Sequence, residues 1–259
     1  MSKPKISIIL PSISPEKWED LYGQIKKSVG QFAFEVICVG PFFPPKQLET
    51  LVNFKFITDF GCVSRCLQIG ASVAEGEYLT WLPDDSIVIE KALEDTVLLF
   101  QQKRKIDGIT ILYSEGSNFS GNQHLDPKYW TCGTHADLRL PSVNNSWQIA
   151  PIFMYQSDYF REIGGLDCSF EHVNMNTHDL AFRVQNAGGT IFPSPCRVLA
   201  VNWKPWGEPK GVIQRAYEEN DLPAFRKLYG GEINPLLRNV ELGNWRKTES
   251  IWSRRFLKK

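Results

Sequence analysis

Short apolar runs alternate with segments of helical periodicity along the first half of the chain. Runs rich in branched and aromatic residues, most of them closed by proline, glycine or aspartate, predict buried strands at Lys5–Pro11, Phe34–Val39, Phe54–Thr58, Glu77–Leu82 and Gly108–Tyr113. Apolar positions at helical spacing predict helices over 15–29, 45–52, 62–74 and 89–103. This alternation predicts an α/β fold with a mostly parallel sheet that helices cover on both faces.

The second half of the chain is less regular. The pattern is lost between 114 and about 148, a length that is typical of functional or mobile segments. Thr177 is the expected N-cap of a helix over 177–187, with Asp179 in its first turn. The remaining predicted elements are an apolar run at Ile149–Tyr155, a helix at 157–163, strands at Thr190–Phe192 and Arg197–Asn202, and a helical segment at Lys210–Tyr229 that Pro223 breaks.

Composition narrows the class of protein. The chain is 42% hydrophobic, which is enough for a large core, and its 29 basic residues equal its 29 acidic ones. The zero net charge argues against a nucleic-acid-binding protein. The six cysteines form no Cys-x-x-Cys pair, which argues against a structural zinc site. We find neither a signal peptide nor a membrane span, so we expect a cytoplasmic protein with reduced thiols.

Two adjacent carboxylates, Asp84 and Asp85, follow the fourth predicted strand directly after Pro83. Adjacent carboxylates repel each other unless a positive group or water compensates them. Ligands of parallel sheets bind at the carboxyl ends of the strands, where Ser12 and Asp59 also fall. The pattern therefore predicts a ligand site at this edge; the alternative is that the aspartates only cap the helix that follows.

Four segments carry a resemblance to a known family. They are Ile-Ser-Ile-Ile-Leu-Pro-Ser at 6–12, Ala-Glu-Gly-Glu-Tyr-Leu-Thr-Trp-Leu-Pro-Asp-Asp-Ser-Ile at 74–87, Phe-Arg-Glu-Ile-Gly-Gly-Leu-Asp at 160–167 and His-Asp-Leu-Ala-Phe-Arg-Val-Gln-Asn-Ala-Gly-Gly at 178–189. In this order they resemble the family 2 glycosyltransferases, which have the GT-A nucleotide-sugar fold. The resemblance covers roughly residues 5–203.

The resemblance implies an organisation and an activity. The GT-A domain would span 1–205, with a nucleotide-sugar-binding half at 1–113 and an acceptor-binding half at 114–205, followed by a C-terminal helical extension at 206–259. The implied activity is the inverting, metal-dependent transfer of a sugar from a nucleotide-diphosphate sugar, with a UDP-sugar favoured. The implied acceptor is a glycan or lipid-linked molecule of surface polysaccharide or glycoconjugate assembly.

The resemblance also assigns the donor site. Asp85 would bind Mn²⁺ or Mg²⁺ and Asp84 the donor, although Pro83 stands where many members have a first Asp. Pro11 and Ser12 match the loop that touches the base and ribose.

Two further positions complete the implied donor site. Arg65 would reach the nucleotide, with a surface salt bridge as the alternative. Many members read uracil with an Asp after the second strand, but this chain has Cys-Val-Gly-Pro at 38–41. Asp59 is the expected substitute.

An inverting transferase also needs a general base that deprotonates the acceptor hydroxyl. Counting from Arg183 places the family's base at Thr177, whose hydroxyl cannot serve. We favour Asp179, with His178 or Glu171 as substitutes. Asp179 also has two readings without catalysis, as a first-turn charge that favours the helix dipole or as an i,i+4 partner of Arg183.

On the acceptor side we expect sugar contacts from Tyr129, Trp130, His135 and Trp147, with local packing as the alternative. The basic and aromatic tail at 245–259 suits peripheral contact with the inner face of an anionic membrane, with a solvated tail as the alternative.

Two other functions are compatible with parts of the sequence to different degrees. The departures at Pro83, Thr177 and 38–41 suit a catalytically inactive nucleotide-sugar-binding partner subunit. A nucleotidyltransferase is disfavoured, because residues 11–20 offer no Gly-rich phosphate loop.

Overall fold

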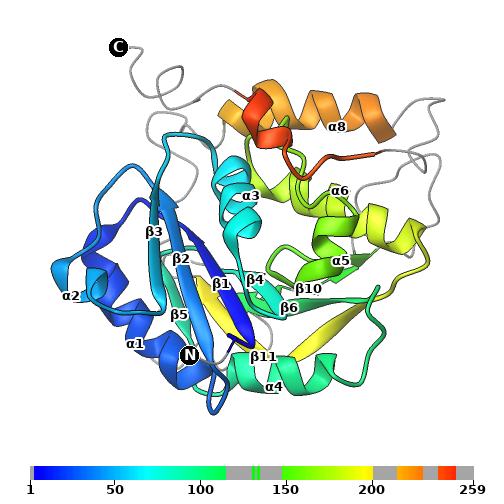
Figure 1. Ribbon diagram of the computed structural model, residues 1–259. Coiled ribbons are helices and arrows are strands. Elements are labelled where there is room, and N and C mark those ends of the chain that lie inside the picture. The colour runs from blue at the N-terminus through cyan, green and yellow to red at the C-terminus, as the bar shows by residue number, and fades with distance from the viewer. Residues whose placement is uncertain are drawn as a thin grey trace.

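The computed structural model describes residues 3–114, 130–131, 133–134, 148–200, 215–229 and 239–248. A central sheet of nine strands has the order β3-β2-β1-β4-β10-β6-β11-β5, with β7 paired to β6 (Figure 1). Its strands are β1 Ile6–Pro11, β2 Phe34–Gly40, β3 Phe54–Thr58, β4 Tyr78–Trp81, β5 Ser86–Val88, β6 Gly108–Ser114, β7 Trp130–Thr131, β10 Phe153–Gln156 and β11 Ile191–Ala200. A separate pair joins β8 (Gly133–Thr134) and β9 (Gln148–Ile149).

Most strands of this sheet point the same way. β1 pairs in parallel with β2 and β4, β2 with β3, and β6 with β11. β10 lies antiparallel between β4 and β6, while β5 and β7 run antiparallel to β11 and β6. Six strands therefore share one direction, which confirms the prediction of a mostly parallel sheet.

Helices cover both faces of the sheet (Figure 1). α1 and α4 pack together on one face, against β5 and β11, while α3 and α5 cover the other face over β1, β2, β4 and β10. The helices are η1 Pro15–Lys17, α1 Trp18–Ser28, α2 Lys46–Glu49, α3 Val63–Val73, α4 Ala92–Phe100, α5 Ser157–Glu162, α6 Val173–Asn186, η4 Tyr217–Asp221, α8 Leu222–Tyr229 and η6 Asn244–Lys247. None of the helices described is long and apolar enough to cross a membrane.

α6 begins earlier than the sequence predicts. It starts at Val173, with His172 as the N-cap, because Nδ1 of His172 accepts a hydrogen bond from the backbone N–H of Asn174 at 3.2 Å. Thr177 and Asp179 therefore lie beyond the first turn, and the prediction that Thr177 caps the helix is wrong.

Pro223 does not break the C-terminal helix. The five residues before α8 form a π-helical turn, η4, and helix α8 follows without interruption. The wider turn accommodates the proline ring, whose nitrogen has no hydrogen to donate to the preceding turn.

The two strands predicted at 190–202 are one strand, β11, with an irregular register between Pro193 and Arg197.

The described parts of the predicted extension pack on the body of the fold. α8 contributes Phe225 and Tyr229 to a second apolar cluster, which also holds Ile149, Phe170, Met175 and Phe182. η6 lies against α3. Residues between 149 and 182 thus share a core with residues beyond 205.

Candidate functional site

The loops that follow β1, β2 and β3 are joined at the carboxyl edge of the sheet. The backbone N–H of Ser12 donates to the carbonyl of Val39 at 2.9 Å, and that of Asp59 donates to the carbonyl of Gly40 at 3.2 Å. A Cβ atom at Gly40 would lie only 1.9 Å from the carbonyl oxygen of Ser12. Position 40 therefore has no room for the side chain of a base-reading aspartate.

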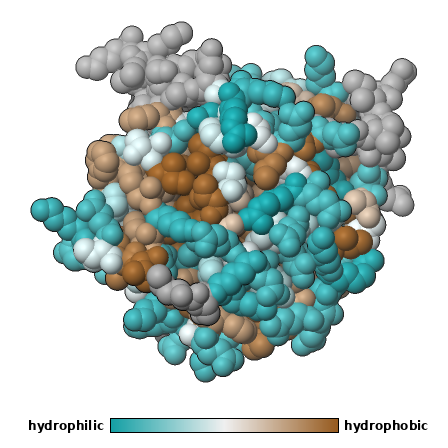
Figure 2. Space-filling view, viewed as in Figure 1, coloured by the Kyte–Doolittle hydropathy of each residue, from teal (hydrophilic) through white to brown (hydrophobic). Residues whose placement is uncertain are grey.

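Apolar side chains are exposed on these same loops. Ile13, Phe42, Phe43 and Phe60 are 52%, 45%, 74% and 47% exposed. Figure 2 shows hydrophobic side chains gathered on the face that carries the upper ends of β2 and β3, beside α3. Exposed apolar groups beside a polar edge are typical of a surface that a ligand covers.

Asp84 is buried and anchored. Its Oδ2 accepts hydrogen bonds from the backbone N–H groups of Ile13 at 2.7 Å and Ser14 at 2.6 Å, and from Nε1 of Trp18 at 3.1 Å. These donors compensate the carboxylate charge and fix the loop between β1 and η1. No described residue donates to its Oδ1.

Asp85 is the opposite case. Its carboxylate makes no hydrogen bond or ion pair with another described residue, and it is only partly buried. Burial raises the pKa of Asp85, and the charge of Asp84 raises it further, while Lys17 acts in the opposite direction. The segment after the pair forms β5, and α4 begins only at Ala92, so the alternative of a helix cap is wrong.

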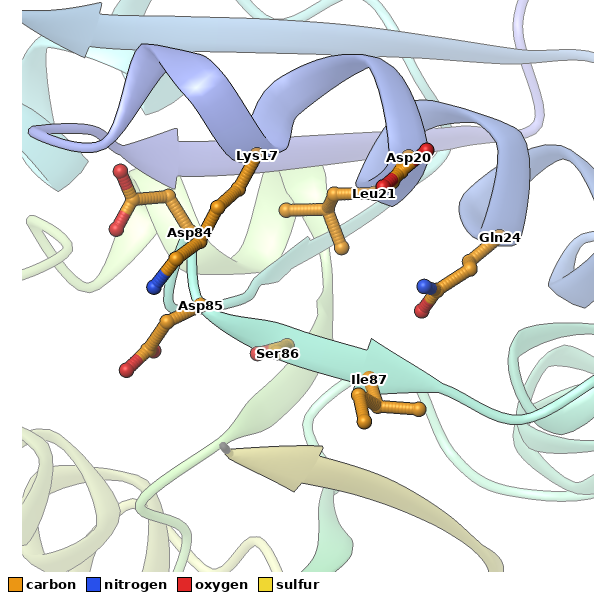
Figure 3. Close-up of a pocket in the computed structure, with 8 residues that line it drawn as sticks. All are labelled: Lys17, Asp20, Leu21, Gln24, Asp84, Asp85, Ser86 and Ile87. Atoms are coloured by element: carbon orange, nitrogen blue, oxygen red, sulfur yellow. The ribbon is translucent and has the colours of Figure 1, made fainter. Parts of the chain in front are cut away.

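A pocket of about 170 Å³ opens beside the two aspartates (Figure 3). Its lining comes from η1 and α1 on one side and from the start of β5 on the other: Lys17, Asp20, Leu21, Gln24, Asp84, Asp85, Ser86 and Ile87. Figure 3 shows the Lys17 side chain extending from the helix toward the aspartates. Lys17 is therefore a positive group of this chain beside the paired carboxylates.

The site offers few ligands for a metal ion. The described residues contain no group of three or more His, Cys, Asp or Glu side chains that can hold one. Asp85 supplies one uncommitted carboxylate. One carboxylate fits a hard cation such as Mg²⁺ or Mn²⁺ when the phosphates of a substrate and water supply the remaining ligands.

Asp59 and Arg65 form an ion pair at the β3–α3 junction. Nη2 and Nε of Arg65 both lie 2.9 Å from the Asp59 carboxylate, which also accepts from the backbone N–H of Gly61 at 2.7 Å. Nη1 of Arg65 donates to the carbonyls of Thr248, at 2.9 Å, and Trp245. Arg65 thus links this loop to η6, and the donor-binding roles of both residues stay predictions.

Side chains of α3 and α6 hold the turn at Gly164 and Gly165, where φ is +83° and +65°. Gln68 of α3 donates to the carbonyl of Gly164 at 2.8 Å and accepts from the N–H of Leu166 at 2.8 Å. Arg183 donates to the carbonyl of Gly165. The third and fourth motifs thus contact each other at this turn, and Gln68 of α3 holds the same turn from another side, which the motif order alone does not reveal.

Asp179 is fully buried on α6. Nε of Arg183 donates to its Oδ2 at 3.0 Å, and the hydroxyl of Tyr229 donates to its Oδ1. Of the two non-catalytic roles predicted for Asp179, the i,i+4 ion pair with Arg183 is confirmed, whereas the role as a first-turn charge is wrong. The role of Asp179 as a base stays a prediction.

Of the two substitutes for the base, Glu171 lies just before α6 and His178 lies within it. Glu171 is buried just before the helix, where its backbone N–H donates to Asp221 at 2.8 Å. Nδ1 of His178 contacts the carbonyl of Asn174, and its ring centroid lies 6.3 Å from that of Phe225.

Asp221, which the sequence analysis missed, is a buried carboxylate of η4. It accepts from the N–H groups of Glu171 and His172 at 2.8 and 2.6 Å, and burial raises its pKa to about 6. The two partners are 50 and 49 residues away along the chain, so no local pattern indicates the contact.

The predicted acceptor contacts are only partly covered by the structure. Trp130 lies in β7, paired with Ser114 of β6. Tyr129, His135, Trp147 and the tail at 249–259 lie outside the described residues. Trp245, the first residue of the predicted tail, has its ring 5.2 Å from the Arg65 guanidinium.

Comparison with known proteins shows similarity in structure. No protein-family model matches the chain, and a search of curated proteins finds no match. Residues 1–349 of S. aureus TarS in complex with UDP superpose with a TM-score of 0.55 at 16% identity, over 76% of this chain and 60% of that chain. GalNAc-T7 with UDP, GalNAc and Mn²⁺ gives a TM-score of 0.58 at 14% identity, over 98% of this chain and 58% of that chain.

These matches establish the fold. The chain has the GT-A fold, as the sequence motifs predict, and it spans about three-fifths of the length of either neighbour.

Proposed function

We propose that this protein is a glycosyltransferase that uses a nucleotide-diphosphate sugar, with a UDP-sugar favoured. The observation that carries the proposal is the pair Asp84 and Asp85 at the carboxyl edge of a GT-A sheet. The Asp84 carboxylate accepts hydrogen bonds from the backbone of the loop after β1, whereas the Asp85 carboxylate makes no hydrogen bond or ion pair with another described residue. Both similar structures contain UDP, and one contains Mn²⁺.

The proposed reaction is inverting and metal-assisted. Asp85 would hold Mn²⁺ or Mg²⁺, which neutralises the charge of the leaving diphosphate when it is bound. Asp84 would act chiefly by holding the loop of Pro11 and Ser12, which we place against the base and ribose. The acceptor would be a glycan or lipid-linked molecule in surface polysaccharide or glycoconjugate assembly.

We assign proton acceptance to Glu171 rather than to Asp179. Asp179 lies six residues into α6, about 9 Å along the helix axis from its start. Both of its oxygens accept hydrogen bonds from buried side chains. Glu171 precedes the helix, and the carbonyl of its neighbour Phe170 contacts Sγ of Cys62, at the carboxyl edge of the sheet, at 3.8 Å. Glu171 is thus the acidic candidate whose neighbour in the chain contacts the β3–α3 junction.

The second candidate is a nucleotide-sugar-binding partner subunit without transfer activity. Thr177, at the position of the family's base, supports it. The Thr177 hydroxyl donates to the carbonyl of Asn174 at 2.9 Å, so it is engaged within its own helix and offers no base.

Calorimetric binding of UDP, GDP and dTDP, each with Mn²⁺ and then with EDTA, tests the donor site. We expect one nucleotide to bind with Mn²⁺, and binding to weaken strongly in Asp85→Ala. Asp20→Asn is the matched control, because Asp20 is an exposed carboxylate of the same pocket. If no nucleotide binds under any condition, the transferase proposal is wrong.

A transfer assay separates the two candidates. Glu171→Gln should retain nucleotide binding and lose turnover if the protein is a transferase with this base. A parent protein that binds the nucleotide and releases no product from any donor and acceptor tested would favour the partner subunit.

A further inference from the structure

Lys17 and Asp85 carry opposite charges, line the same pocket and remain apart. Neither forms an ion pair with any described residue, although the charge of Lys17 partly offsets the rise that burial causes in the pKa of Asp85. Figure 3 shows both side chains at the end of the pocket that holds Asp84. The pocket therefore contains an uncommitted ammonium group as well as an uncommitted carboxylate.

The position of Lys17 is fixed by the site itself. Lys17 ends η1, and its backbone N–H donates to the carbonyl of Ser14 at 3.0 Å. The next residue, Trp18, is fully buried, and both Ser14 and Trp18 donate to Oδ2 of Asp84. The backbone on both sides of Lys17 is thus tied to the carboxylate that neighbours Asp85. This anchoring distinguishes Lys17 from a lysine that merely lies exposed to solvent on the surface.

We infer that Lys17 binds the diphosphate of the nucleotide and opposes the binding of a divalent cation at Asp85. The inference rests on the proposed function, since it assigns a further residue to the same donor site. Like charges repel, so the ammonium weakens the affinity of Asp85 for a cation when no nucleotide is present. A diphosphate carries negative charges that attract the ammonium, whose flexible stem allows it to turn toward them.

The consequence is a donor site that depends less on metal than one built from carboxylates alone. Without metal, the positive charge for the diphosphate would come from Lys17, the one lysine or arginine among the described residues that line the pocket. With metal bound, the negative charge of the phosphates would offset the repulsion between the cation and the Lys17 ammonium.

Lys17→Met tests the inference, because methionine keeps a long apolar stem and removes the charge. Mn²⁺ binding alone is measured by electron paramagnetic resonance, and UDP binding in EDTA by calorimetry. We expect Mn²⁺ to bind about threefold more tightly or better, and UDP in EDTA about tenfold more weakly. Lys17→Arg should restore UDP binding. Lys26→Met, an exposed lysine of α1 outside the pocket, should match the parent in both assays.

The outcomes are separable. Unchanged Mn²⁺ affinity, or unchanged UDP affinity in EDTA, in a Lys17→Met protein with the parent's urea midpoint would overturn the inference. Failure of the parent to bind UDP under any condition contradicts the proposed function and the diphosphate role together. The Mn²⁺ measurement then decides whether Lys17 opposes a cation at Asp85.

Discussion

Arg183 donates from Nε to Oδ2 of Asp179 across 3.0 Å, and the two side chains are 6% and 0% exposed. The same guanidinium donates to the carbonyls of Ile163 and Gly165, and the same carboxylate accepts from the hydroxyl of Tyr229. One buried pair therefore joins α6 to the turn before it and to α8.

Removing the charge of Asp179 should destabilise the fold. Asp179→Asn leaves the Arg183 guanidinium buried without its counterion, so we expect a loss of about 3 kcal/mol in the free energy of unfolding, measured with urea. Asp158→Asn is the control, because Asp158 is 84% exposed in its pair with Arg161 and should cost less than about 0.5 kcal/mol. Equal losses in the two variants would contradict this structural role for Asp179.

The pH dependence of stability should report on Asp221. Burial raises its pKa to about 6, against about 3.9 for an unfolded chain. Between these values the folded state binds the proton more tightly, so the contribution of Asp221 to the free energy of unfolding falls as pH rises.

Asp221→Asn replaces the carboxyl group with an amide that does not titrate in this pH range. The variant should therefore gain stability relative to the parent as pH rises from about 4 to about 7, by roughly 2–3 kcal/mol. Urea unfolding of both proteins across that range measures the difference, with Asp158→Asn as the control for an exposed carboxylate. A difference between variant and parent that stays constant with pH would show that the Asp221 pKa is not raised.

The strands could be predicted well from the sequence because their signals are local. The runs at 34–40 and 54–58 are apolar and end where glycine or aspartate closes them, so their bounds follow from neighbouring residues. The paired aspartates at a strand end likewise indicate a ligand site without knowledge of contacts.

The structure after residue 148 could not be predicted as well, because contacts between residues far apart in the sequence determine it. The start of α6 depends on the cap by His172 and on the hydrogen bond from His172 to Asp221. The spacing of apolar residues along the helix indicates neither contact. Arg65 bonds to residues as far as 183 positions away, which makes its guanidinium part of the packing of η6. The sequence does not indicate Lys17, because its proximity to Asp85 arises only when β4 pairs with β1.

Glu35 should stabilise the amino-terminal edge of the sheet. Its buried carboxylate accepts from Oγ of Ser7 at 2.5 Å and from the backbone N–H of Glu75 at 2.6 Å, and pairs with Lys55 at 2.9 Å. Burial alone would raise the pKa of Glu35, but these partners hold it below its usual value. Because the folded pKa is depressed, the stabilisation is present above the unfolded pKa of about 4.3 and is lost as pH falls through the folded value.

Glu35→Gln should therefore lower the free energy of unfolding by about 1–3 kcal/mol near neutral pH, and by less in acid. Urea unfolding at both pH values measures it. Glu75→Gln is a matched control, because Glu75 pairs with the same lysine but is 65% exposed, so its loss should stay below about 1 kcal/mol. A cost for Glu35→Gln that did not shrink in acid would refute the assignment to the charged form.

Gly40 should be intolerant of any side chain. A Cβ there would lie 1.9 Å from the carbonyl oxygen of Ser12, so the loops after β1 and β2 must separate to admit it. We expect Gly40→Ala to cost about 1–3 kcal/mol in urea unfolding and to weaken UDP binding, because the displaced loop carries Pro11 and Ser12.

Gly23→Ala is the control for this substitution. No atom lies within 4 Å of a Cβ at Gly23, which sits inside α1, so alanine should stabilise the protein by about 0.5–1 kcal/mol. UDP binding by this variant should match the parent. If Gly40→Ala kept both the parent's stability and its UDP affinity, the close contact between the two loops would not be needed for the donor site.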